Sequence, residues 1–201
     1  MVNDIANILK TKLTPLTFID RLAGLVRVQT TTSESGAVVR FPVSCDISFA
    51  DCNNVNSTYK DLIPNSSAKC IVYFEDFGIT PSTPVITTNL GFTARFKLVG
   101  WINQKKIGSD LCSASSLVVA NIIKQLDVNQ FNQGMYQFIE IVFIGQDAKH
   151  NTNPFSKYSY DENVNQYLMK PYDYFSLNFD VNFDLNTACL NDLIINTEIP
   201  C

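Results

Sequence analysis

The chain has 201 residues, of which 46% are hydrophobic, 11% aromatic and 17% charged, with a formal net charge of −4. This composition excludes a disordered tail, and the length fits one folded domain with long loops better than two separate cores. The mild acidity provides no general field for condensing onto DNA or an anionic membrane, so tight sequence-independent nucleic-acid binding is disfavoured.

The first residues and the hydrophobic runs indicate a soluble protein that is intracellular when made. Met1 to Leu13 include Asp4 and lack the basic start and continuous apolar core of a signal peptide. No run reaches the roughly 18 to 20 apolar residues that a membrane span requires.

In chain order, a helix is predicted first, with Asn3 as its N-cap and its end before Pro15. A second short helix is predicted over residues 17–23, followed by a β-hairpin whose strands cover residues 25–30 and 37–43. The polar stretch 45–69 predicts a long loop, and loops of that length are usually functional or become ordered on a partner.

The second half of the chain mixes strands with one more helix. We predict in turn a short strand at 70–74, a Pro- and Thr-rich excursion at 78–90, a long strand at 92–102, a polar turn at 103–106, a helix at 113–126 and a central strand at 136–144.

A second long loop, residues 145–172, is predicted as an interaction surface. Strict alternation of apolar and polar residues from Phe175 to Asn186 then predicts a strand with one buried and one solvated face. The sequence thus predicts an α+β fold: a mainly antiparallel sheet with an N-terminal helix and one central helix packed on a sheet face. We expect a single domain over residues 1–186 and an apolar docking arm over residues 187–201.

The six cysteines are expected to be free thiols, because a chain with its own core needs no covalent staples and cytosolic thiols stay reduced. A disulfide bridge and a zinc site remain as alternatives. These residues are Cys45, Cys52, Cys70, Cys112, Cys189 and Cys201.

Residues able to support catalysis are sparse. The single histidine, His150, lies in a polar loop, and a dyad with Cys112 is the weaker alternative to a solvated side chain. Asp180 and Asp184 would lie about 13 Å apart along a strand, too far for a glycosidase pair, and the following residues break the calcium-loop pattern. We therefore assign no catalytic, cofactor or metal residue and expect a protein that is not an enzyme.

Lys105 and Lys106 stand at the tip of a predicted turn, after Arg95 and Lys97 on the preceding strand. A solvated tip is the simpler interpretation, and contact with DNA phosphates is the functional one.

The order of predicted elements, closing with Tyr174-Phe175-Ser176-Leu177-Asn178-Phe179-Asp180-Val181, resembles that of tail-completion and tail-terminator proteins, the head–tail connector rings of tailed bacteriophages. The resemblance covers most of the chain and rests on element order and the last strand's pattern. The Asn-rich, Lys-over-Arg composition resembles the product of an AT-rich genome, which is compatible with the crAss-like phage group.

This resemblance implies a virion protein, assembled in the host cytoplasm, that forms a homo-oligomeric ring between portal and tail. Its neighbours would be portal, connector or tail proteins, and genomic DNA would pass through with transient, non-specific contact. A ring joins one patch to a different patch on the next copy. The opening helix and the closing arm would supply these patches through Ile5, Ile8, Leu9, Leu190, Leu193, Ile194, Ile195 and Ile199.

An alternative from another class is a carbohydrate- or protein-binding module of a fibre or adhesin. Its platform would be the aromatic residues of the second long loop, Phe155, Tyr158, Tyr160, Tyr167 and Tyr172. A third hypothesis is that the protein is an unrecognised hydrolase.

Overall fold

The computed structural model describes residues 1–32, 36–44, 62–108, 114–127, 130–147, 153–159 and 166–189. These contain the strands β1 (Arg21–Thr32), β2 (Val38–Ser44), β3 (Cys70–Ser82), β4 (Leu90–Asn103), β5 (Phe131–Gln133), β6 (Tyr136–Gln146) and β7 (Tyr172–Leu185). The helices are α1 (Val2–Leu13), α2 (Gln104–Ile107) and α3 (Ala114–Leu126), with 3-10 turns η2 (Gln166–Leu168) and η3 (Thr187–Cys189).

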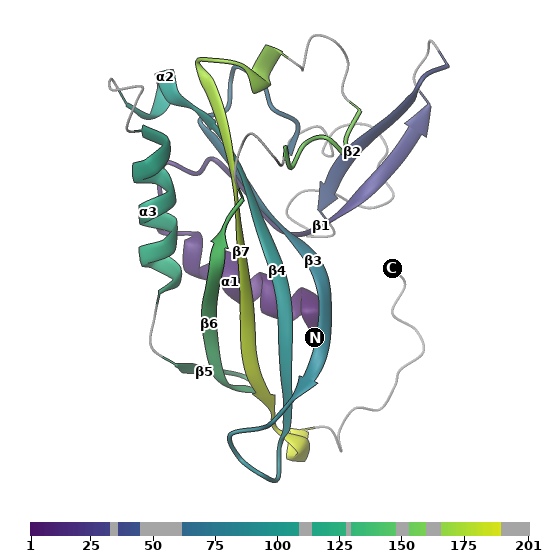
Figure 1. Ribbon diagram of the computed structural model, residues 1–201, viewed down its shortest axis with the longest axis vertical. Helices are drawn as coiled ribbons and strands as arrows, with labels where there is room; N and C mark the ends of the chain where they lie inside the picture. The colour runs from purple at the N-terminus through teal and green to yellow at the C-terminus, as the bar shows by residue number, and fades with distance from the viewer. Residues whose placement is uncertain are drawn as a thin grey trace.

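The seven strands form one mostly antiparallel sheet, in the order β2-β1-β3-β4-β7-β6-β5, in which β1 and β3 run parallel. In Figure 1, α1 crosses the back of this sheet and α3 stands beside α1. The α+β class predicted from the sequence is confirmed. The 136–144 strand is confirmed as β6, but β4, and not β6, occupies the centre of the sheet.

The opening helix forms as its apolar spacing predicts, because Ile5, Leu9 and Leu13 share one face and are fully buried. It ends at Leu13, before Pro15, as predicted. The predicted cap is wrong: the helix begins at Val2, so Asn3 lies within its first turn.

The short helix predicted over residues 17–23 is absent, because β1 already begins at Arg21. A segment this short cannot offset the cost of helix nucleation, and tertiary contacts decide its path. The Asp20 carboxylate accepts the backbone N–H groups of Lys69 (2.9 Å) and Cys70 (3.0 Å), which fixes the chain beside the start of β3.

The predicted hairpin is confirmed, and β1 pairs with β2 from Val26 to Thr32. The part of β1 before Val26 pairs with β3, and the last residue pair between these two strands is Leu25 with Phe74. Beyond Leu25 the two-stranded β1–β2 ribbon turns away from the sheet, as Figure 1 shows.

The third strand is longer than the predicted 70–74 segment, since β3 continues to Ser82 through a bulge between Asp76 and Ile79. Gly78 takes a φ of +103° in this bulge, and its N–H donates to the Asp76 carboxylate (2.7 Å). The predicted excursion therefore shrinks to residues 83–89. The polar turn predicted at 103–106 is instead the one-turn helix α2.

The helix over 113–126 and the final alternating strand are confirmed as α3 and β7. The polar face of β7 is less solvated than predicted, because Ser176 and Asp184 are only 1% and 2% exposed. They are tolerated there because each is hydrogen-bonded, Ser176 to Asp147 and Asp184 to the N–H of Ile86.

Two hydrophobic cores lie on opposite faces of the sheet. The larger core packs α1 and α3 against the apolar face of β4 and β7. The smaller core covers the upper part of the other face, where Trp101 stacks on Tyr172 and donates its indole N–H to the Tyr167 carbonyl (2.6 Å). Parts of both predicted loops enter this second core through Leu62, Ala68, Phe155 and Tyr158. These four side chains therefore stabilise the fold.

Candidate interaction surfaces

The predicted lysine pair lies on an exposed turn of helix at one end of the sheet. Lys105 and Lys106 are both exposed on α2, and Lys106 Nζ donates to the Ser67 carbonyl (2.5 Å). The N–H of Asn103 donates to the Lys69 carbonyl (2.7 Å), which brings exposed Lys69 to the same place. We call Lys69, Lys105 and Lys106 the lysine end.

Sequence reasoning missed Lys69 because it precedes β3, far from α2 along the chain. The signal that could have found it is the strand register, in which Cys70 pairs with Ile102 and so places the start of β3 beside the end of β4.

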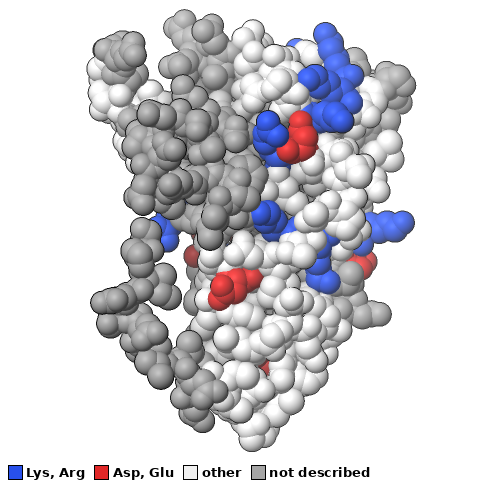
Figure 2. Space-filling model, turned by 180° about the vertical axis from the view of Figure 1, so that it is seen from behind, with Lys and Arg blue, Asp and Glu red and all other residues white. Residues whose placement is uncertain are grey.

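Basic side chains are also spread over the helix-bearing face. Figure 2 shows Lys and Arg from the top of this face to its middle, with fewer Asp and Glu among them. Lys10 and Lys12 stand in the last turn of α1, and Lys124 in that of α3. The described residues hold thirteen Lys and Arg against ten Asp and Glu, a net charge of +3, whereas the rest of the chain holds two against nine. The described body is therefore basic although the whole chain is acidic.

The predicted subunit interface on α1 needs correction. Ile5 and Leu9 are fully buried in the core of their own chain, where the sheet and α3 already satisfy the apolar stripe of the helix. They offer no surface to a neighbour. Ile8 is only partly buried and remains available. The other predicted interface residues, Leu190, Leu193, Ile194, Ile195 and Ile199, lie outside the described residues.

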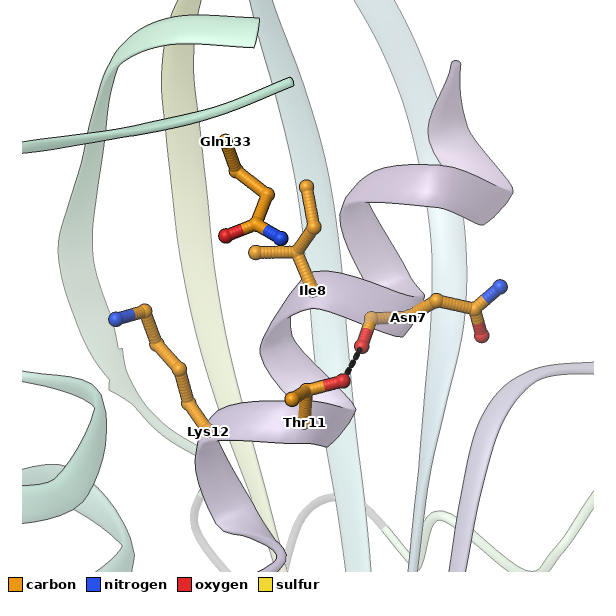
Figure 3. A pocket seen from close by; sticks show the side chains of 5 residues that line it. All are labelled: Asn7, Ile8, Thr11, Lys12 and Gln133. Carbon is orange, nitrogen blue, oxygen red and sulfur yellow. Dashed lines mark hydrogen bonds between the residues drawn. The ribbon is translucent and has the colours of Figure 1, made fainter.

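Ile8 lines a hollow of about 440 Å³, together with Asn7, Thr11, Lys12 and Gln133. In Figure 3 the Asn7 amide and the Lys12 ammonium point to opposite sides of this hollow. The Lys12 ammonium lies 3.7 Å from the centre of the Phe131 ring, and partial burial lowers the pKa of Lys12. Its polar groups do not converge on one point, so the hollow has no catalytic geometry.

The acidic residues considered for catalysis are held by structural partners. Arg95 bonds the Asp180 carboxylate with Nε (2.9 Å) and Nη2 (3.4 Å), while Asp184 accepts the Ile86 N–H (3.0 Å). Glu140 stands opposite Asn182 and not opposite either aspartate, and accepts a hydrogen bond from its amide (3.3 Å). On this face of the sheet, the polar side chains are therefore held by hydrogen bonds and ion pairs to neighbouring residues.

A buried carboxylate lies where β1 leaves β3. Glu75 is 6% exposed, accepts the Tyr158 hydroxyl (3.2 Å) and forms an ion pair with Lys157 (2.5 Å). Burial and the Glu75 charge raise the pKa of Tyr158. The adjoining hollow, of about 340 Å³, is lined by residues of β1 and β3 together with Lys157 and Tyr158. Because its carboxylate is already neutralised, we assign this cluster to holding residues 153–159 on the sheet.

The aromatic platform of the fibre alternative is largely internal. Phe155 and Tyr158 are 2% and 7% exposed, and Tyr167 and Tyr172 pack against the same second core. Tyr160 lies outside the described residues. The rings of Phe155 and Tyr158 therefore stabilise the fold and are too buried to stack on a sugar, whereas Tyr167 and Tyr172 are only partly buried.

The thiol and histidine candidates form no catalytic dyad within the described ranges. His150 and Cys112 fall outside them. Cys70 is free and buried, and burial together with nearby Asp20 raises the pKa of its thiol, whereas Cys189 is free and exposed. Among the described residues, no three His, Cys, Asp or Glu side chains gather as a metal site requires.

No protein-family model and no curated protein matches this chain. None of the described helices is both long enough and apolar enough to cross a bilayer.

Proposed function

We propose that the chain is a non-enzymatic structural subunit of a tailed-phage virion, which assembles into a connector or tail-completion ring between portal and tail. The observation that carries the DNA-facing part of this proposal is the lysine end. It brings three exposed lysines to one end of the sheet, where the Asn103 N–H donates to the Lys69 carbonyl and the Lys106 ammonium donates to the Ser67 carbonyl.

The charge distribution supports transient contact with DNA. A few lysines attract phosphates at short range, while the net charge of −4 opposes condensation of DNA onto the whole subunit. A conduit needs this balance, because DNA must pass it without being held. The paired polar side chains around Asp180 and the buried ring of Tyr158 support a structural role over a catalytic or sugar-binding one.

The test is duplex-DNA binding by the purified chain, measured as a function of salt. We expect weak binding, and we expect Lys105→Glu with Lys106→Glu to weaken it and to lower the slope of log affinity against log salt by about 2. Lys124→Glu with Arg27→Glu changes the charge equally at exposed positions outside the lysine end and is the matched control. Both double variants should fold, because exposed charge changes usually alter the free energy of unfolding by less than about 0.5 kcal/mol.

Equal losses of affinity in the two double variants would show that only net charge matters and would remove the lysine end from the proposal. Electron microscopy of the native chain tests the ring independently, and a strictly monomeric chain that binds a soluble sugar would favour the fibre alternative.

A further inference from the structure

One open backbone edge lies on β6. Its short neighbour β5 pairs only with Tyr136 and Ile139. From Glu140 to Gln146, β6 has β7 on one side and, within the described residues, no strand on the other. This edge is regular from Glu140 to Phe143, and a bulge between Phe143 and Gly145 follows. Val142 and Ile144 in this segment are 39% and 61% exposed.

A second open edge lies on β1, in the ribbon that turns away from the sheet in Figure 1. From Val26 to Thr32, β1 pairs with β2 on one side, while β3 has left the other side after Leu25. This segment contains no proline and no bulge, and Val28 is 48% exposed. A two-stranded ribbon alone in water is only marginally stable, so a third strand would stabilise it.

The other edges are protected in ways that natural sheets use against unwanted pairing. The β3 edge beyond Glu75 contains the bulge at Gly78 and also Pro81, which lacks an N–H. The outer edge of β2 is bridged by Ser159, whose N–H donates to the Arg40 carbonyl (3.0 Å). Within the described residues, this contrast leaves β1 from Val26 to Thr32 and β6 from Glu140 to Phe143 as regular edges without such protection.

We propose that the open edge of β1 in one copy pairs antiparallel with the open edge of β6 in the next copy, with Val28 beside Val142. This inference rests on the ring of the proposed function and names the contact that builds it. Since each chain would use one patch to bind a different patch, the contact is heterologous and repeats from copy to copy, as a ring requires.

The two segments are complementary in chemistry. This register puts residues 27–30 opposite residues 140–143, with Thr30 beside Glu140. Arg27 then faces Phe143, so no like charges meet across the pair. Cross-strand apolar pairs of this kind each contribute roughly 0.2 to 1 kcal/mol, in addition to the backbone hydrogen bonds.

The test is a charge exchange across the proposed pair, read by sedimentation velocity and native mass spectrometry over a concentration series. Val28→Glu alone and Val142→Lys alone each place a charge against an apolar side chain, and each should weaken self-association on the order of tenfold. The double variant carries opposite charges at every β1–β6 contact and should recover most of the native association. Both positions are exposed, so circular dichroism should show native folding in all three variants.

Leu117→Lys is the matched control, because Leu117 is 59% exposed on α3 and belongs to neither strand edge. It should leave association unchanged. A loss in only one single variant would indicate pairing of like edges, β1 with β1 or β6 with β6, and would overturn the proposal. Two single losses without recovery in the double variant would show that Val28 and Val142 do not meet and would also overturn it. Native-like association in all variants would also overturn it while leaving a ring built by other surfaces. A native chain that never self-associates would remove the ring together with this contact.

Discussion

At the residue scale, Asp147 shows how a loop residue becomes part of the sheet. Its carboxylate accepts hydrogen bonds from Ser176 (2.7 Å) and Asn178 (2.6 Å) and pairs with Lys97 (2.8 Å). Partial burial alone would raise the pKa of Asp147, but these three donors outweigh burial, and the pKa lies below its ordinary value. Asp147 thereby ties the end of β6 to β4 and β7.

We predict that Asp147 contributes to the acid sensitivity of the fold. A carboxyl whose pKa is lowered by folding stabilises the native state above its unfolded pKa of about 3.9, and this contribution is lost as the pH falls through the folded pKa. Asp147→Asn should therefore lower stability at neutral pH and flatten its decline below about pH 4. Urea unfolding at a series of pH values, followed by the fluorescence of Trp101, measures this.

Asp76→Asn removes a charge from an exposed side chain and serves as the control for Asp147→Asn. A native slope in the acid range for Asp147→Asn would show that its ion pair contributes nothing to folding.

At the element scale, the fit between β4 and β7 depends on Gly100. A Cβ built on Gly100 would lie 2.1 Å from Cζ of Phe175, its cross-strand partner, so the ring occupies the place of a side chain. Phe175 is 2% exposed and has little room to move. This close approach fixes how Phe175 fills the core beside β4.

We predict that Gly100→Ala lowers the free energy of unfolding by about 1 to 3 kcal/mol, the usual cost of overpacking a core. Phe175→Leu alone should also destabilise, because it leaves a cavity. The double variant should be less destabilised than the sum of the two, since the smaller side chain leaves room for the added methyl group. Urea denaturation of the three variants gives this coupling, and strictly additive losses would contradict the steric explanation.

The elements that sequence predicted well are those whose signal is local. The period-two alternation of β7 and the helical spacing of α1 need only neighbouring residues, because each element has one buried face. The failures came from long-range contacts: Asp20 anchors the chain to β3 where a helix was expected, and Phe155 is buried by strands distant in sequence. The candidate surfaces follow the same rule, since Lys105 and Lys106 were found together but Lys69 joins them only through the β3–β4 register.

At the scale of the whole molecule, the sheet has a well-packed core, whereas β1 and β6 have edges without a partner strand among the described residues. Rings of Phe92, Phe96, Phe143 and Phe179 pack within the larger core, so the apolar face of β7 is already covered. The described chain then ends at η3, where the Thr187 hydroxyl donates to the Thr88 carbonyl (2.9 Å). Five large aliphatic residues follow in the sequence: Leu190, Leu193, Ile194, Ile195 and Ile199.

We predict that these residues serve assembly more than folding. Burying one aliphatic side chain contributes roughly 1.5 to 3 kcal/mol, so five of them are costly to leave in water and should pack on a neighbouring subunit. Deleting residues 190–201 should leave a folded monomer, with a native circular dichroism spectrum and Trp101 fluorescence, that no longer assembles. Leu193→Asn with Ile194→Asn should reduce assembly at full length, whereas Asn191→Ser with Asn196→Ser, which alters polar side chains of the same segment, should not. A truncated chain that assembles normally, or one that cannot fold, would show that the segment belongs to its own core, and self-association would then have to rest on other contacts such as the open edges of β1 and β6.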